Sequence, residues 1–265
     1  DVPSLHQIKQ VAQQIQDVVL KTPLLYAPRL SESFGAKIFL KREDLQGVRS
    51  YKIRGAFHKI ANIPADLRSH GVVAASAGNH AQGVALSCAL LGIQAYIFMP
   101  KTTPLQKVEA VRFHGKEKVR IKLVGNTYDE AFAAAQTFCQ QNQSIFIPPF
   151  DDYDIIAGQA TVALEIVDQL PNPADFMLVA IGGGGLAAGS GLVLKALSPG
   201  TKLIGVEPAL APSMSESLAA HQVVTLDSID SFVDGASVKR VGAKTFGICE
   251  KVLDRMLVVE KQVLC

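Results

Sequence analysis

The sequence predicts an α/β protein with mainly parallel sheets and flanking helices. Short apolar runs alternate with helical stretches along most of the chain, and two runs end in turns of glycine and other small residues. Hydrophobic residues make up 48% of the 265 residues and charged residues 19%, as in a folded protein with a sizeable core. Alternating strands and helices are typical of parallel strands joined by crossover helices.

The first 70 residues predict two helices and one strand. Apolar residues spaced by three or four indicate an amphipathic helix over 5–18, and 36–40 is expected to be a strand. The charged run at 41–44 follows, and a run of this kind is usually a solvated loop. A second helix is expected to begin after Ser50, whose side chain suits an N-cap.

The rest of the chain predicts repeated strand–helix units. Strands are expected at 72–76, 96–100, 119–124, 144–147, 176–181, 202–207 and 252–259. Helices are expected at 81–91, 104–113, 127–141, 154–170, 186–197 and 213–220.

Lys52 is expected in the first turn of the helix after Ser50. The positive end of the helix dipole disfavours a cation there, and partial burial between Tyr51 and Ile53 would also favour the neutral amine. A neutral lysine amine is a nucleophile that reacts with aldehydes. The stretch alone favours an exposed lysine without a role, and the rest of the chain reverses that preference.

Four successive glycines, Gly182, Gly183, Gly184 and Gly185, lie between a predicted strand and a predicted helix. Their amides and the helix N-terminus would form a cradle for a phosphate group. A tight turn without a ligand is the alternative, although one or two glycines would suffice for it. The run also fits G-x-G-x-x-A with Glu207 at the end of the next strand, which keeps a nicotinamide enzyme open.

A second turn, at 76–80, joins the carboxyl end of a strand to a helix, where open α/β sheets bind ligands. Its amides and the Ser76 hydroxyl suit a carboxylate, and the Asn79 amide could donate to a ring oxygen. Asn79 equally suits a helix cap. His80 suits either a base or a structural residue.

Composition excludes several classes of protein. The net charge of +2, without a dense Lys/Arg run, argues against nucleic acid as a partner. No apolar run reaches the length of a membrane span, and the polar first residues lack a signal-peptide core, so a cytoplasmic protein is expected, or an organellar one in a plant or fungus. Cys88, Cys139, Cys249 and Cys265 are scattered, so neither a metal site nor a disulfide framework is indicated.

The order of these motifs resembles the fold-type II family of pyridoxal-phosphate enzymes, and its threonine/serine dehydratases in particular. The resemblance extends over nearly the whole chain, and its matching stretches are 41–46, 50–56, 76–83, 158–159, 182–186, 206–208 and 234–235. It implies the two-lobed architecture of the tryptophan synthase β type. Residues 1–70 and 148–265 would form the large cofactor-binding lobe, and 71–147 a small lobe inserted in it.

The resemblance also implies a cofactor, pyridoxal 5'-phosphate, and a role for each motif. Lys52 would hold the cofactor aldehyde and then accept the substrate Cα proton, with Tyr51 beside the ring. Asn79 would donate to the ring hydroxyl, and Gly182 to Gly185 with the amide of Leu186 would hold the phosphate. The substrate carboxylate would be received by Ser76, Ala77, Gly78, Asn79 and His80.

The reaction implied is the dehydration and deamination of L-threonine, and of L-serine, to a 2-oxo acid and ammonia. The resemblance also implies a role in amino-acid metabolism, such as isoleucine biosynthesis, and a homodimer or homotetramer. A serine racemase or another lyase of the family is the first alternative. Racemases usually have a serine where this chain has Ala77. They also tend to have an acidic residue that binds a divalent ion in the segment equivalent to 209–213, which contains no acidic residue here.

One family feature is not found in the sequence. The catalytic domain of the family ends in a Ser/Thr-Gly-rich turn that contacts the pyridine nitrogen, and no such turn follows Asp234-Gly235. The expectation from this departure is a cofactor pocket without one of its walls. A non-catalytic, amino-acid-binding remnant is therefore a further alternative.

Overall fold

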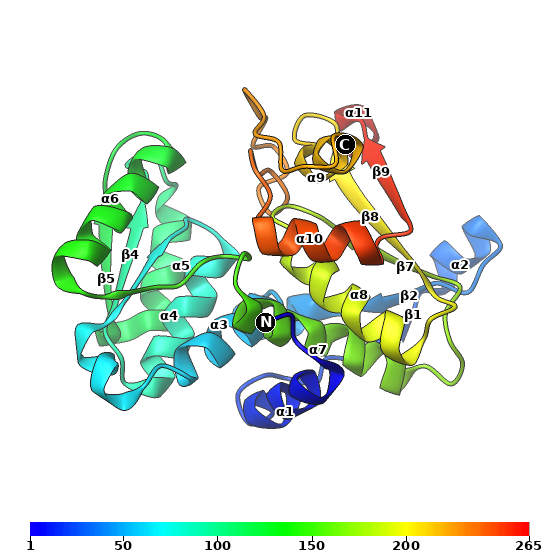
Figure 1. Cartoon of the computed structure of the whole chain (residues 1–265), viewed down its shortest axis with the longest axis horizontal. Coiled ribbons are helices and arrows are strands. Elements are labelled where there is room, and N and C mark those ends of the chain that lie inside the picture. Colours follow the sequence, from blue (N-terminus) through cyan, green and yellow to red (C-terminus); the bar gives the residue numbers. More distant parts are fainter. Residues whose placement is uncertain (265) are drawn as a thin grey trace.

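Three sheets organise the chain in the computed structural model, which describes residues 1–264 (Figure 1). The predicted class is confirmed, because both larger sheets are parallel and carry helices. Cys88, Cys139 and Cys249 are free, and Cys265 lies outside the described residues. Within residues 1–264 no helix is both long and apolar enough to cross a bilayer.

The four-stranded sheet has the order β5-β4-β3-β6, with every pair parallel. Its two faces have separate cores, because successive side chains of a strand point to opposite faces. Ala74 and Ile97 pack with α4 and α5, whereas Val73 and Phe98 pack with α6. Its elements are β3 (Val72–Ala75), α4 (Asn79–Leu91), β4 (Ala95–Met99), α5 (Leu105–Gly115), η3 (Lys116–Lys118), β5 (Val119–Leu123), α6 (Tyr128–Asn142) and β6 (Ile145–Phe146).

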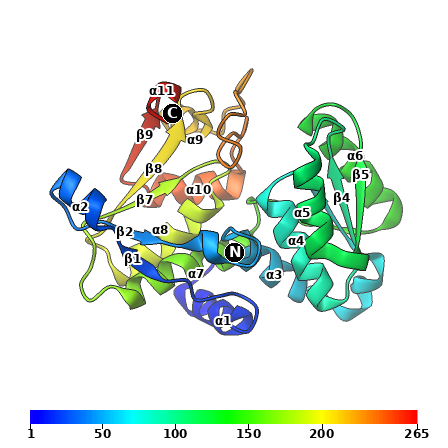
Figure 2. The same cartoon turned by 180° about the vertical axis from the view of Figure 1, so that it is seen from behind.

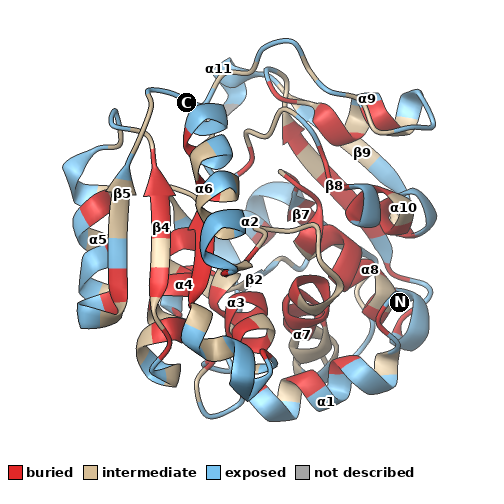
Figure 3. Cartoon of the chain, turned by 60° about the vertical axis from the view of Figure 1, so that its left-hand side comes forward, coloured by how far each residue is buried: buried red, intermediate tan, exposed pale blue. Residues whose placement is uncertain are grey.

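The three-stranded sheet has the order β7-β8-β9, also parallel, and lies beside α8 and α10 (Figure 2). It begins after the long helix α7, which the burial colouring shows largely enclosed (Figure 3). The elements are α7 (Tyr153–Gln169), β7 (Phe176–Ala180), α8 (Gly185–Leu197), β8 (Lys202–Pro208), α9 (Ser213–Ala219), α10 (Ala243–Val252), β9 (Arg255–Val259) and α11 (Lys261–Leu264).

The N-terminal part wraps around α7. β1 and β2 form a two-stranded antiparallel sheet, so the strand expected at 36–40 is shorter and shifted. The helices α2 and α10 were not predicted. The elements are α1 (Leu5–Ile15), β1 (Leu24–Tyr26), α2 (Pro28–Phe34), β2 (Phe39–Lys41), η1 (Glu43–Leu45), α3 (Lys52–Ala61) and η2 (Ala65–His70). The lobe boundaries at 71 and 147 stay a prediction.

Glycines set the spacing of the three helices at the centre. A Cβ on Gly158 of α7 would lie 2.4 Å from the Cα of Gly55 on α3, so the two backbones touch. A Cβ on Gly189 of α8 would lie 2.6 Å from the carbonyl oxygen of Ile156. The first close crossing fixes α3, and with it Lys52, against α7. The second fixes α8, and with it the glycine turn, against the same helix.

We expect Gly158→Ala to destabilise the protein strongly. The added methyl group has no space between two backbones, so α3 and α7 must separate; such overpacking destabilises by about 1–3 kcal/mol and occasionally more. Urea denaturation measures the change. Gly247→Ala in α10 is the matched control: nothing lies within 4 Å of its Cβ, and alanine should stabilise that helix by about 0.5–1 kcal/mol. Equal effects of the two substitutions would contradict the crossing.

Candidate active site

Lys52 is the first residue of α3, as the sequence predicted, but Ser50 is not the N-cap. The N-cap is Tyr51, whose backbone is already near-helical (φ −63°, ψ −12°) and whose side chain makes no capping bond. The chain enters the helix through a tight turn in which Arg54 N donates to Tyr51 O at 3.0 Å. Ser50 Oγ is buried and has no hydrogen-bond partner within the described chain.

The Lys52 amine loses its proton more easily than an exposed lysine does. Its Nζ donates to the carbonyl oxygen of Pro149 at 2.8 Å. Burial lowers the pKa of Lys52 to about 8, because the charged form loses its hydration. The ring centroid of Tyr51 lies 5.5 Å from Nζ, and burial raises the pKa of that phenol to about 12, so it stays neutral. The neutral, nucleophilic form of the amine is thus more abundant near pH 8 than in an exposed lysine.

A buried ion-pair network holds the helix behind Lys52. The Arg54 guanidinium is fully buried and lies 2.7 Å from Glu43 and 2.6 Å from Glu165 of α7. Lys41 Nζ also contacts Glu165, at 2.5 Å. The expectation of a solvated loop at 41–44 is therefore wrong for Lys41 and Glu43, because the partners that draw them inward lie on distant helices.

The turn at 76–80 lies next to Lys52. α4 begins there, and a Cβ on its Gly83 would lie 3.1 Å from the carbonyl carbon of Lys52. Ser76 Oγ accepts from Gly78 N at 3.2 Å. The amides of Asn79 and His80 donate to no group within residues 1–264, and they form the start of a helix. This arrangement of hydroxyl, free amides and helix dipole suits a carboxylate.

The structure separates the roles left open for Asn79 and His80. The N-cap of α4 is Gly78, so Asn79 is not the cap, and its side chain is exposed. His80 is buried, and its Nε2 donates to the carbonyl oxygen of Ile147 at 2.9 Å. Burial, together with the nearby charge of Lys52, lowers the pKa of His80 to about 3. His80 is therefore neutral, and its hydrogen bond to Ile147 gives it a structural role.

The glycine turn enters α8 with its amides free. Gly184 is the N-cap, with a left-handed backbone (φ +92°) that favours glycine. No group within residues 1–264 accepts a hydrogen bond from the amides of Gly183, Gly184, Gly185 or Leu186. The turn thus presents four donors at the positive end of a helix, an arrangement that suits an anion.

Packing around the glycine turn explains why side chains are excluded from it. A Cβ on Gly183 would lie 2.1 Å from the ring of Phe150, and one on Gly184 2.8 Å from Met214 Cε. Thr245 Oγ1, at the start of α10, donates to the carbonyl oxygen of Gly183 at 2.6 Å. The turn is therefore held from two sides.

One short segment connects Lys52 to the glycine turn. Pro149 accepts from Lys52, Phe150 packs on Gly183, and Asp151 accepts from three amides at the start of α10, the shortest bond being 2.8 Å to Lys244 N. Asp152 caps α7 through the amides of Asp154 and Ile155. Phe150, Asp151 and Thr245 were not predicted from the sequence; two aspartates before a helical stretch are a cap signal, but it indicates only Asp152.

Two features bear on whether the site binds a nicotinamide dinucleotide or a metal ion. Glu207, the acid of the dinucleotide fingerprint, is buried and accepts from Met214 N at 2.7 Å and Ser215 N at 2.9 Å. Its carboxylate caps α9 and is not free to bind a ribose. Among residues 1–264, no group of three or more His, Cys, Asp or Glu side chains is placed to hold a metal ion.

The chain matches one protein family along most of its length. The profile of the family described as pyridoxal-phosphate dependent enzyme matches residues 15–264. Biosynthetic L-threonine dehydratases of Halalkalibacterium halodurans and Bacillus subtilis are each 50% identical to the chain, over 253 and 265 residues. These alignments cover 96% and 99% of the chain, which itself spans 61% and 63% of the length of the two relatives.

Solved structures resemble the whole chain. The processed form of threonine deaminase isoform 2 from Solanum lycopersicum has a TM-score of 0.90 and 40% identity, covering 98% of this chain and 72% of that one. Maize serine racemase has a TM-score of 0.94 and 31% identity, covering 100% of this chain and 79% of that one.

Proposed function

Because this chain belongs to the family of pyridoxal-phosphate dependent enzymes, we propose that it dehydrates and deaminates L-threonine, and L-serine, to a 2-oxo acid and ammonia. The observation that carries the proposal is the junction at 149–151, which joins the Lys52 amine to the glycine turn. Two relatives at 50% identity that are L-threonine dehydratases support the substrate.

The residues of the site fit pyridoxal 5'-phosphate. The four free amides of Gly183 to Leu186 suit its phosphate, and the close packing of Phe150 and Met214 leaves no space for side chains at Gly183 and Gly184. The Lys52 amine, with its pKa lowered to about 8, suits its aldehyde. The Asn79 side chain, which has no partner within the described chain, suits its ring hydroxyl. When bound, the cofactor withdraws electrons from the substrate Cα and so weakens the bond to its proton.

The chain's own residues would divide the remaining work. The Ser76 hydroxyl and the free amides of Asn79 and His80 would orient the substrate carboxylate, and Tyr51 would cover one side of the cofactor ring. Lys52 would accept the Cα proton at Nζ, and the resulting ammonium group could supply the proton with which the β-hydroxyl leaves as water. The buried Arg54 network and the carbonyl of Pro149 would keep Nζ in place. The released product then hydrolyses to the 2-oxo acid and ammonia.

The second candidate function is racemisation of serine. Similarity to maize serine racemase favours it, but Ala77 offers no group that could return a proton to the opposite face of the substrate. We therefore propose dehydration as the main reaction. A homodimer or homotetramer and a cytoplasmic location remain proposals from the resemblance, and light scattering of the purified chain would test the first.

The test is a spectrum and a product assay on the purified chain. Added pyridoxal phosphate should give the visible band of the lysine-bound cofactor, and L-threonine should then be converted to 2-oxobutyrate. L-Valine, which lacks a β-hydroxyl leaving group, is the control and should give no 2-oxo acid. A band without product from L-threonine or L-serine would identify a non-catalytic remnant, and D-serine as the main product from L-serine would identify a racemase.

A further inference from the structure

A segment between α9 and α10 crosses both turns of the site. We define residues 226–240 as the strap. Its two ends are tied together, because Leu226 N donates to Lys239 O at 2.9 Å and Arg240 donates to Thr225 Oγ1 at 2.8 Å. The strap therefore projects as a closed loop from the part of the chain that carries the glycine turn.

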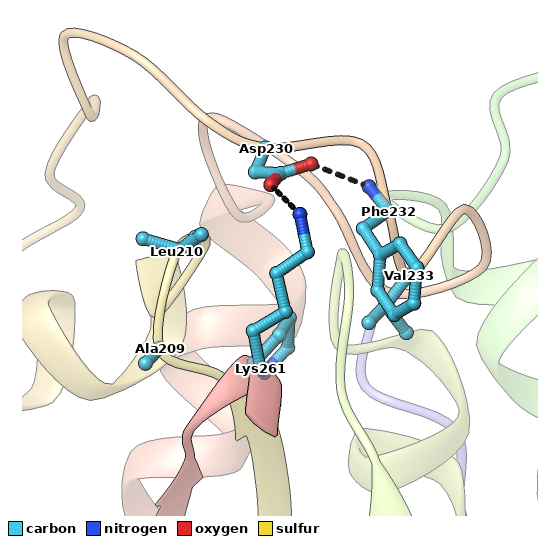
Figure 4. A pocket seen from close by; sticks show the side chains of 7 residues that line it. Ala209, Leu210, Asp230, Phe232, Val233 and Lys261 are labelled. Atoms are coloured by element: carbon cyan, nitrogen blue, oxygen red, sulfur yellow. Dashed lines mark hydrogen bonds and ion pairs between the residues drawn. The ribbon is translucent and has the colours of Figure 1, made fainter. Parts of the chain in front are cut away.

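The base of the strap is also anchored to α11 (Figure 4). Lys261 Nζ lies 2.7 Å from the Asp230 carboxylate and 4.7 Å from the ring centroid of Phe232. The other carboxylate oxygen of Asp230 accepts from Phe232 N at 2.8 Å. These contacts fix where the residues after Phe232 lie.

The middle of the strap lies close to both predicted binding turns. A Cβ on Gly182 would lie 3.2 Å from both the Cα of Ala236 and the carbonyl oxygen of Gly235. A Cβ on Gly78 would lie 3.6 Å from Oδ2 of Asp234. The strap is thus a wall shared by the phosphate side and the carboxylate side of the site.

An ion pair joins the strap to the other side of the site. Lys107 of α5 lies 2.7 Å from the same Oδ2 of Asp234 that faces Gly78. The two side chains are 35% and 63% exposed, and exposed pairs contribute little to stability. A weaker second contact, 3.6 Å between Lys239 and Asp129 of α6, spans the same two parts. Because the pair contributes little to folding stability, its role is better sought in where it lies, between the strap and α5.

We propose that Lys107 and Asp234 are positioning residues for the substrate carboxylate, an inference that rests on the proposed function. The pair holds the strap across the turn at 76–80. Lys107 also neutralises Asp234, whose negative charge would otherwise lie beside the amides that receive the substrate carboxylate and repel it. Without Lys107 the site should bind amino acids more weakly while binding pyridoxal phosphate as before.

The test combines kinetics with hydrogen exchange on the chain loaded with pyridoxal phosphate. Lys107→Ala should raise KM for L-threonine about fivefold and Lys107→Glu about tenfold or more, with kcat within about twofold. Lys107→Glu with Asp234→Lys should restore KM. Amides at 230–238 should exchange faster in both single variants and return to normal in the double one, while the dissociation constant of pyridoxal phosphate stays constant.

Arg112→Ala is the matched control, because it removes an exposed ion pair with Glu109 from the same helix without reaching the strap. It should leave KM and exchange at 230–238 unchanged. Unaltered exchange in Lys107→Ala would overturn the proposed hold on the strap, and faster exchange with unaltered KM would overturn the positioning role. If the wild-type chain releases no 2-oxo acid at all, the proposed function fails, while the exchange measurement still decides whether the pair holds the strap.

Discussion

Replacing Lys52 with alanine is expected to abolish release of the 2-oxo acid and the visible band of the bound cofactor. Lys52 would supply both the covalent attachment and the group that accepts the Cα proton, and loss of a positioned base alone lowers rates by about 10²–10⁴-fold. Reduction with borohydride followed by peptide mass mapping should mark Lys52 in the wild type and no residue in the variant. Lys9→Ala, on the exposed side of α1, is the control. An unchanged band in Lys52→Ala would refute the assignment.

The same lysine gives a pH dependence whose sign follows from its lowered pKa. Covalent uptake of pyridoxal phosphate needs the neutral amine, so its rate should rise as the pH passes through about 8 and level off above it. Protonation of the buried amine also disfavours the folded state. Between about pH 8 and the ordinary lysine value of 10.5, the unfolded chain holds a proton that the folded chain lacks, so this group makes stability rise with pH there. Lys52→Met should remove that rise from pH-dependent unfolding curves of the cofactor-free chain.

Gly183→Ala is expected to weaken cofactor binding without removing Lys52. The added methyl group would meet the Phe150 ring at 2.1 Å, so either the ring or the turn must move. Overpacking of this kind amounts to about 1–3 kcal/mol, which corresponds to a dissociation constant about 5- to 150-fold higher. A shift of Phe150 would also disturb Pro149, the acceptor of the Lys52 hydrogen bond. Titration of the visible band with pyridoxal phosphate measures the effect.

Two further variants separate this clash from a general loss of stability. Gly200→Ala places a methyl group where nothing lies within 4 Å and should leave the dissociation constant unchanged. Gly183→Ala combined with Phe150→Leu gives the new methyl group more space and should recover part of the affinity. Equal binding by wild type and Gly183→Ala would show that the glycine turn does not hold the phosphate.

Local signals determined much of the fold before the structure was known. The short apolar runs became β3, β4, β5, β7 and β8. The signal is strongest for β3, which is buried on both faces, as parallel strands between helices are. The glycine turn at the start of α8 and the small-residue turn before α4 were also readable. The positive φ of Gly184 favours glycine at the start of α8, and within α4 the nearby backbone of Lys52 leaves little space for a side chain at Gly83.

Other features were decided only by the tertiary structure. The sequence places Lys41 and Glu43 in a charged run, and only the fold brings Arg54 and Glu165 close enough to bury them. Likewise, nothing local to Phe150, Asp151 or Thr245 shows that they hold the glycine turn, because their partners are more than 30 residues away. The ion pair of Lys107 and Asp234 joins helix and strap across 127 residues of sequence.

The sequence by itself therefore predicted which residues carry the proposed chemistry, and the tertiary structure decided what holds them in place. The physical reason is the distance along the sequence between the residues that interact. Caps, turns and strand patterns depend on neighbours within a few residues, so they can be read directly. The lowered pKa of Lys52 and the support of the glycine turn arise from burial and contacts between distant segments, which exist only once α3, α7 and α8 have packed together.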